Sequence, residues 1–125
     1  MQTSQKVMED FFQEYHDAIN ALDVNKIARF FHVPGMICNN NNVYLLTSQE
    51  VLLKSLNDLI SKQKTLESHH SDFVIMAIVD VDSDRILASV EWTISDKKDI
   101  PIRKLRSTYN LIKSDDQWKI VLLME

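Results

Sequence analysis

The chain has 125 residues, of which 45% are hydrophobic and 26% are charged, a composition typical of a globular domain rather than a disordered segment. Fourteen Lys and Arg against eighteen Asp and Glu give a net charge of −4, which argues against generic nucleic-acid binding. The single glycine, Gly35, excludes the glycine-rich phosphate loops, and the single cysteine, Cys38, excludes an internal disulfide. We therefore expect one domain over residues 1–125 that does not depend on an oxidising compartment.

The beginning of the chain carries no targeting pattern. Residues 1–10 are polar and mixed in charge, without the basic segment and apolar stretch of a secretory signal. No apolar run approaches the ~20 residues that span a bilayer. A cytoplasmic protein without membrane association is therefore expected.

The first third of the chain predicts two helices. Apolar side chains recur at intervals of three and four residues, which predicts an amphipathic helix over about residues 4–22 with Ser4 as its N-cap. Asp23 is expected to cap a second, short helix, and Pro34 with Gly35 to end it.

A short hairpin and a third helix are expected next. Residues 36–38 predict a strand, the asparagines at 39–42 a turn, and residues 43–46 the returning arm. The third helix begins at Thr47 or Ser48 and fades between residues 64 and 68.

The rest of the chain predicts four strands. Residues 84–95 carry the clearest pattern, because apolar side chains occupy every second position from Ile86 to Ile94. The apolar run 73–79 predicts a strand buried on both faces, and residues 100–113 and 118–124 predict two more. In the last strand the side chains expected on the inner face are Trp118, Ile120, Leu122 and Met124. This order predicts an α+β fold, with three N-terminal helices on one side of a mostly antiparallel sheet.

Three stretches carry a resemblance to a known family. They are Ile27–Phe31 before the first short strand, the turn into Asp84–Trp92, and the closing Asp115–Ile120. With the element order, they make the chain resemble the nuclear transport factor 2-like (NTF2-like) superfamily, also called SnoaL-like or cystatin-like cone folds. The resemblance covers nearly the whole chain. It implies a strongly curved sheet around a cone-shaped cavity and a homodimer through the outer sheet face. Apolar residues on both sides of the predicted sheet favour the dimer independently.

The same resemblance implies a choice of activities. Family enzymes include polyketide cyclases, dehydratases, an epoxide hydrolase and ketosteroid isomerase, whose Asp base and oxyanion hole are a worked example in general treatments of catalysis. In isomerase-like members the base lies on the short strand after the second helix. Asn39 stands near that position here. Asparagine cannot abstract a proton at neutral pH, so this position argues against isomerase chemistry and leaves binding of a polar ligand open.

Four residues are candidates for lining the cavity: Tyr15, Asn39, Trp92 and Tyr109. Tyr15 and Trp92 each have a simpler interpretation as core aromatics, and Tyr109 fits a cavity wall and the core equally well. His16, one position round the first helix, is expected to face solvent. No catalytic residue is identified from the sequence.

Glu91 lies on the polar register of its strand. We expect it to pair with Lys104 or Arg106 on the outer sheet face, and a catalytic role follows only if the two faces are reversed.

Neither a metal nor a cofactor is expected. His69 and His70 are adjacent, so on a strand they face opposite ways. The Asp80, Asp82 and Asp84 turn lacks the glycine and terminal glutamate of a calcium loop.

Three functions remain as hypotheses. The preferred one is a homodimeric cone-fold protein that binds a small, largely apolar molecule. The second is a cyclase, dehydratase or isomerase-like enzyme that uses Tyr15, Tyr109 and an unidentified acid or base. The third is a dimeric protein-interaction module without a ligand.

Overall fold

The computed structural model describes residues 3–64 and 70–125, and of residues 62–64 it describes the backbone. His69 and the predicted end of the third helix beyond Lys64 lie outside the described residues. The helices are α1 (Ser4–Asn20), α2 (Val24–Ala28) and α3 (Gln49–Lys64), and the strands are β1 (Phe31–Asn39), β2 (Asn42–Leu46), β3 (His70–Asp82), β4 (Arg85–Ser95), β5 (Pro101–Ser114) and β6 (Gln117–Met124).

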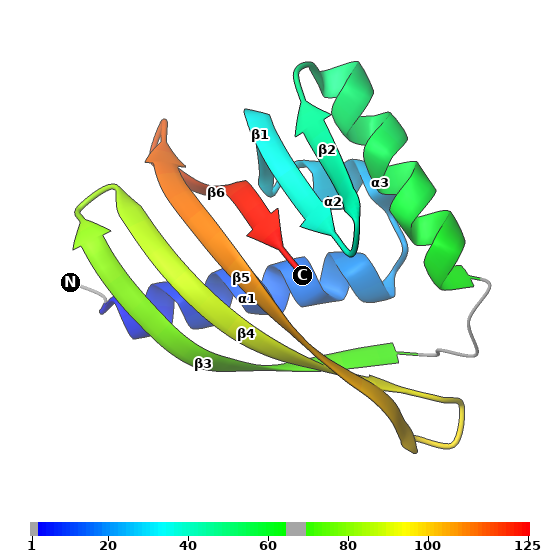
Figure 1. The fold of residues 1–125 in the computed structure, drawn as a ribbon. Coiled ribbons are helices and arrows are strands. Elements are labelled where there is room, and N and C mark those ends of the chain that lie inside the picture. Colours follow the sequence, from blue (N-terminus) through cyan, green and yellow to red (C-terminus); the bar gives the residue numbers. More distant parts are fainter. Residues whose placement is uncertain (1–2, 65–69) are drawn as a thin grey trace.

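The strands form one sheet in the order β2-β1-β6-β5-β4-β3, and every neighbouring pair is antiparallel except β1 and β6. The long strands β3, β4 and β5 curve together, α1 crosses their concave side, and α3 covers the β1–β2 hairpin (Figure 1). The sheet stays open, with β2 and β3 as its two edges. The predicted α+β architecture of helices on a curved, mostly antiparallel sheet is therefore confirmed.

Side-chain caps define where the first two helices begin. The hydroxyl of Thr3, one residue before the predicted Ser4, accepts the Lys6 backbone N–H at 3.2 Å and caps α1. Asp23 caps α2 as predicted, by accepting the Lys26 N–H at 3.2 Å. The apolar face of α1 is buried through Met8, Phe11, Phe12, Tyr15 and Ala18.

The second helix is shorter, and the first strand longer, than predicted. β1 begins at Phe31 and includes Pro34 and Gly35, which were expected to end the helix. Pro34 is tolerated because the pairing of β1 with β6 is irregular at this point and needs no N–H from it. At Gly35 a Cβ would lie 2.6 Å from the carbonyl oxygen of His32, so the close backbone approach requires glycine.

The two predictions about strand patterning, for β4 and for β3, have different outcomes. In β4 the predicted alternation is confirmed, since Ile86, Val90 and Trp92 are buried between more exposed neighbours. In β3 the expected burial on both faces is wrong for the single chain, because this strand is an edge and leaves Val74 60% and Val79 54% exposed on its outer face.

An extra residue in β6 changes which of its side chains face the core. Leu111 of β5 pairs with Ile120, but the adjacent Asn110 pairs with Leu122, so Val121 forms a bulge. A bulge of this kind shifts the inward–outward alternation of the strand by one residue.

The shifted alternation corrects the sequence-based assignment of β6. Leu123 is 4% exposed, whereas Met124 is 50% exposed. Leu122 shares the outer face with Asn110, so the prediction that Leu122 and Met124 line the inner face is wrong. The position after Met124 returns to the inner register.

We predict that Leu123→Ala lowers the free energy of unfolding by roughly 2–5 kcal/mol, because it leaves a cavity in the core. Leu122→Ala, a matched change one residue earlier on the outer face, should cost less than half as much. Urea denaturation of both variants measures the two values. Equal costs, or a larger cost at Leu122, would contradict the position of the bulge.

Candidate functional site

Two tyrosines and a tryptophan from different elements meet on the inner face of the sheet. Tyr15 comes from α1, Trp92 from β4 and Tyr109 from β5, and none is more than 5% exposed. The Trp92 indole Nε1–H donates a hydrogen bond of 3.1 Å to the Tyr109 hydroxyl oxygen. The Tyr15 ring centroid lies 6.1 Å from the centroids of both other rings. Three polar groups are thus held inside an aromatic core.

Ser107 adds a buried hydroxyl to this group. It precedes Tyr109 by two residues on β5, so both side chains point to the same face, and Ser107 is 0% exposed. Within the described residues its Oγ makes no hydrogen bond of good geometry, although it lies close enough to the Tyr109 hydroxyl and the Glu125 carboxyl to lower the pKa of both groups. An unpaired buried hydroxyl costs roughly 1–3 kcal/mol, so this group is one that a bound molecule could satisfy.

The Glu125 carboxyl lies near these groups, since its charge acts on both tyrosines. Its backbone N–H donates to the Cys38 carbonyl oxygen at 2.9 Å, and its Oε2 accepts the Asn39 Nδ2–H at 2.9 Å. Figure 1 shows the end of β6 in the middle of the molecule, between the long strands and the β1–β2 hairpin. We call Tyr15, Trp92, Ser107, Tyr109 and Glu125 the Tyr109 cluster.

Burial changes the proton affinity of the Glu125 carboxyl. Desolvation by the surrounding protein raises its pKa above the usual value, while the Arg103 guanidinium and the Ser107 hydroxyl act in the opposite direction. Glu125 as a whole residue is exposed to solvent, although its carboxyl is largely desolvated by the surrounding protein.

The two tyrosines remain neutral donors. Burial raises the pKa of Tyr15 well above its ordinary value, and negative charge on Tyr109 or Glu125 would raise it further. Burial, followed by the charge of Glu125, also raises the pKa of Tyr109, although the Trp92 N–H opposes this. Of the five cluster side chains, Glu125 therefore titrates nearest to neutral pH. The cluster can hydrogen-bond a neutral polar group, and its carboxyl can accept or donate a proton.

The structure brings all four sequence-predicted candidates together. Tyr15, Trp92 and Tyr109 lie in the core of the cluster, and Asn39 holds the Glu125 carboxylate at its edge. Sequence reasoning missed Glu125, because its inward orientation depends on the β6 bulge, and no residue in that strand predicts a bulge.

His16 was expected to face solvent, and this prediction is wrong. Its side chain is only 15% exposed, and its ring packs against Phe73 and Trp92 with centroid distances of 5.6 and 6.4 Å. The α1 face that meets the sheet is therefore wider than the apolar stripe of the helix indicates.

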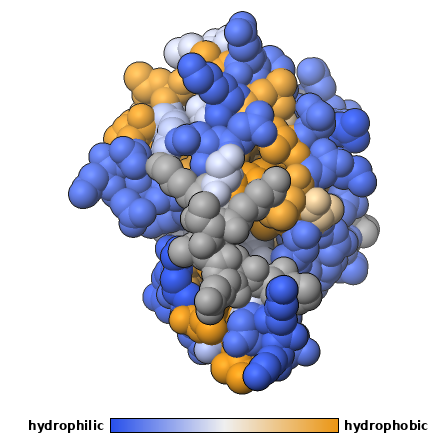
Figure 2. All heavy atoms as spheres, turned by 90° about the vertical axis from the view of Figure 1, so that its right-hand side faces the viewer, coloured by the Kyte–Doolittle hydropathy of each residue, from blue (hydrophilic) through white to orange (hydrophobic). Residues whose placement is uncertain are grey.

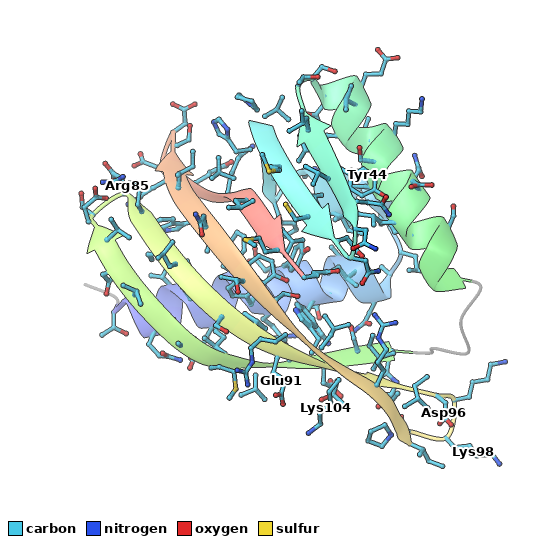
Figure 3. All side chains as sticks on the ribbon, viewed as in Figure 1. Tyr44, Arg85, Glu91, Asp96, Lys98 and Lys104 are labelled. Carbon is cyan, nitrogen blue, oxygen red and sulfur yellow. The ribbon has the colours of Figure 1, made fainter. Side chains whose placement is uncertain are left out.

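Glu91 lies on the outer face, which is the alternative that the sequence favoured without deciding between the two faces. Its carboxylate lies 3.8 Å from Lys104 Nζ and 3.6 Å from an Arg106 guanidinium nitrogen. Figure 3 shows Glu91 and Lys104 pointing away from the concave side of the sheet. This arrangement separates Glu91 from the Tyr109 cluster.

Other polar groups in the described part of the chain form local contacts. Asp82 ion-pairs with Arg85 at 2.7 Å, and this hydrogen bond lowers the pKa of the Asp82 carboxyl. No group of three His, Cys, Asp or Glu among the described residues is arranged to hold a metal ion.

A separate polar groove of about 310 Å³ lies near the start of β1 and the β5–β6 turn, and His32, Gln49, Asp115 and Lys119 are among its lining residues.

None of the described helices combines the length and apolar content needed to cross a bilayer.

The comparison with known proteins agrees with the observed fold. Residues 4–125 match the family described as "NTF2-like protein (DUF6841)". The chain belongs to this NTF2-like family. A search of curated protein sequences finds no match to it.

Solved structures with the same fold share little sequence with this NTF2-like protein. An NTF-2 like protein of unknown function from Shewanella oneidensis MR-1 has a TM-score of 0.77 and 15% identity, with 98% of each chain covered. A ketosteroid isomerase-like protein from Erwinia carotovora atroseptica SCRI1043 has a TM-score of 0.74 and 13% identity, covering 99% of this chain and 95% of its own. A domain of unknown function with a cystatin-like fold from Nostoc punctiforme PCC 73102 has a TM-score of 0.78 and 14% identity, covering 98% and 77%. At these identities the likeness establishes the fold alone.

We predict that Glu125→Gln makes the protein more resistant to unfolding at pH 7 to 8 than the wild type. Because burial raises the pKa of Glu125, the folded state binds this proton more tightly than the unfolded state. Below the unfolded-state pKa both states hold the proton and the carboxyl has no effect. As the pH rises from there through the folded-state pKa, the wild type loses stability that the variant keeps.

Thermal unfolding midpoints of both proteins from pH 4 to pH 8 test this. The difference between them should be smallest at pH 4 and grow in favour of the variant. Glu91→Gln is the matched control, because it removes an ion pair with Lys104 and Arg106 instead of a burial penalty and should not stabilise the fold. A difference between Glu125→Gln and wild type that shrinks as the pH rises would contradict the prediction.

Proposed function

We propose that this NTF2-like protein binds a small, largely apolar molecule whose single polar group, such as a carbonyl oxygen, is received by the Tyr109 cluster. The observation that carries this proposal is the Ser107 hydroxyl, which is fully buried near Tyr109 and Glu125 and makes no hydrogen bond of good geometry with either. Sites for small molecules typically combine an apolar wall with a few convergent polar groups, and the cluster has this composition.

The wall supports an apolar ligand. Trp92, Val90 and Leu123 supply buried apolar surface on the same inner face. Hydrophobic atoms also reach the surface between hydrophilic regions on the side of the molecule that Figure 2 presents.

Access to the buried hydroxyl depends on Glu125. Ser107 has no exposed surface, whereas Glu125 is the one cluster residue that is exposed as a whole. A ligand therefore reaches Ser107 by displacing the Glu125 carboxyl, which Asn39 can retain through its amide. The ligand's polar group then takes the place beside Ser107 that the carboxyl leaves.

A second candidate function is acid–base catalysis of the kind found in cyclases or isomerases. The observation that favours it is the position of the Glu125 carboxyl, with its raised pKa, beside two neutral tyrosine hydroxyls. An enzyme of this type needs a carboxyl or histidine on the inner face, and Glu125 meets that requirement. In this reading Glu125 exchanges a proton with the ligand, and the tyrosines donate hydrogen bonds to it.

One experiment with trans-2-decalone, an apolar ketone, tests binding and catalysis together. In a Trp118→Phe background, Trp92 is the only tryptophan, so its emission reports binding near the cluster. We expect binding that Ser107→Ala weakens about threefold to tenfold, because the carbonyl loses a hydrogen-bond donor. Ser107→Ala should leave the unfolding midpoint unchanged or higher, since it removes an unpaired buried hydroxyl.

Ser89→Ala is the matched control, because Ser89 lies on the outer face beside Thr108 and should not affect binding. Absence of binding, or equal affinities for both serine variants, would refute the binding proposal. Exchange of the ketone's α-hydrogens in D₂O, followed by NMR, separates the two functions. Exchange faster than in buffer, lost in Glu125→Gln, identifies catalysis, and binding without exchange identifies a binding protein.

We further propose that a second copy of the chain covers the outer face of the sheet. This face carries exposed Val74, Val79 and Leu87 in the β3–β4 region. The ladder pairs place a second apolar group on the same face across β2, β1 and β6, formed by Met36, Cys38, Val43, Leu45, Leu122 and Met124.

The charges between these groups suit a two-fold dimer. Glu91 lies beside Lys104 and Arg106, so the face offers both signs of charge to an identical face turned through half a rotation. A symmetric contact of this kind would bury the apolar groups and align unlike charges.

We predict that the wild type is a dimer in solution and that the double change Val74→Asp and Leu87→Asp makes it a monomer. Two carboxylates would otherwise be buried unpaired in the interface. Light scattering after size-exclusion chromatography gives the molar mass. Leu22→Asp is the control, because Leu22 is also exposed but lies in the α1–α2 turn, away from the sheet. A monomeric wild type, or a double variant that stays dimeric, would refute the proposal.

A further inference from the structure

We propose that His16 is a pH-sensitive positioning residue for the Tyr109 cluster. Its ring, held between α1 and β3, supports the Trp92 indole that hydrogen-bonds Tyr109, and its charge changes that support. The effect on ligand binding rests on the proposed function, but the coupling between His16 and Trp92 does not.

The His16 ring lies nearly parallel to the Trp92 indole. The ring centroids are 6.4 Å apart and the planes differ by 11°. Phe73 contacts the same imidazole with a centroid distance of 5.6 Å. The His16 side chain is 15% exposed, so it has little freedom to leave this position. A change at the imidazole is therefore transmitted to the indole by direct contact.

Both ring nitrogens of His16 face hydrogen-bond acceptors. Nδ1 lies 3.1 Å from an Asp17 carboxylate oxygen, and Nε2 contacts the Ser71 backbone carbonyl oxygen. An Asp72 carboxylate oxygen is 3.8 Å from Nε2. A neutral imidazole has one N–H and can satisfy only one of these sides, whereas an imidazolium has two N–H groups and satisfies both.

The side-chain amides of Asn20 and Gln13 offer the neutral ring a second hydrogen-bond arrangement. Asn20 Nδ2 lies 2.9 Å from His16 Nε2 and 3.1 Å from the Ser71 carbonyl oxygen. Gln13 Nε2 lies 3.4 Å from Nδ1 and 3.0 Å from the Asp17 carboxylate. Each amide can donate to the ring when a nitrogen is unprotonated, and to the neighbouring oxygen when it is protonated. The site thus has two hydrogen-bond arrangements, one for each charge of His16.

The charged groups around His16 come from two elements. On its own helix the neighbour is Asp17, which is 66% exposed, and on β3 it is Asp72, which is 71% exposed. His70 also approaches Asp72, at 3.7 Å, and Asp99 at 3.4 Å, so the two histidines share the Asp72 carboxylate. The β4 residue that packs against the ring is Trp92, which carries no charge. Asp17 is therefore the closest charge to the ring. Salt should weaken the electrostatic attraction between its carboxylate and a protonated His16.

Protonation of His16 acts on the cluster through the indole. At a centroid distance of 6.4 Å between nearly parallel planes, the imidazole does not lie over the indole face, so an imidazolium acts on the indole as a nearby positive charge. This makes the indole N–H a stronger donor to the Tyr109 oxygen, at the 3.1 Å hydrogen bond. The cluster is therefore held more firmly at acidic pH than at alkaline pH.

Trp92 emission in a Trp118→Phe and Glu125→Gln background tests the coupling without any ligand, because the titrating carboxyl of the same cluster is then removed. Histidine changes its charge between about pH 5 and 8, so we expect one transition in this range, with lower emission at the acidic end. The transition should be absent in His16→Gln and should persist in His70→Gln. Flat emission from pH 5 to 8, or a transition that survives in His16→Gln, would overturn the proposal.

A second measurement uses protein that retains His16, so the test does not depend on whether the His16→Gln variant folds. In the Trp118→Phe protein, the NMR shifts of the Trp92 indole N–H and of the His16 ring protons should titrate with one common midpoint. Different midpoints, or an indole shift that does not titrate, would overturn the coupling. The affinity for trans-2-decalone, measured over the same pH range, distinguishes the positioning role of His16 from the proposed ligand-binding function. If Trp92 titrates but no ketone binds, the positioning role stands and the proposed function fails.

Discussion

The single extra residue in β6 determines what faces the interior of this protein. Because Val121 is bulged out of the ladder with β5, the strand changes phase, so that Leu123 enters the core and Glu125 follows it to the inner face. Without the bulge, Glu125 would be on the outer face and the inner face would carry aromatic rings and hydroxyls without a carboxyl. The polar groups present on the inner face of the sheet therefore depend on one irregular backbone pairing.

The polar groups on the inner face form a graded series from core to solvent. Tyr15 and Tyr109 are buried and stay protonated, Ser107 is buried without a well-formed hydrogen bond, and Glu125 is exposed as a residue although its carboxyl is largely desolvated. Buried polar groups cost stability unless they are satisfied, so a core that holds several of them beside an apolar wall is poorly explained by packing alone. Such a series suits recognition of a molecule that is apolar over most of its surface and polar at one end.

Sequence patterning was sufficient where a strand or helix follows a regular period. The alternation in β4, the amphipathic face of α1 and the Asp23 cap were predictable, and they bring Tyr15, Trp92 and Tyr109 to one place. The remaining features depend on long-range pairing. Irregular pairing of β1 with β6 allows Pro34 inside a strand, the β6 bulge reverses an apparent alternation, and β3 covers His16 although this residue lies beside the apolar stripe of its helix. None of these features leaves a periodic signal in the local sequence.

The parallel contact between β1 and β6 has a consequence for how the protein folds. Asn39 and Glu125, which hydrogen-bond each other, are 86 residues apart in the chain. Contacts of such long separation form slowly, because the intervening chain loses much of its freedom before the contact is made. We therefore expect the carboxyl edge of the cluster to form late in folding, so that a molecule that recognises it would bind the finished native state and not a partly folded chain.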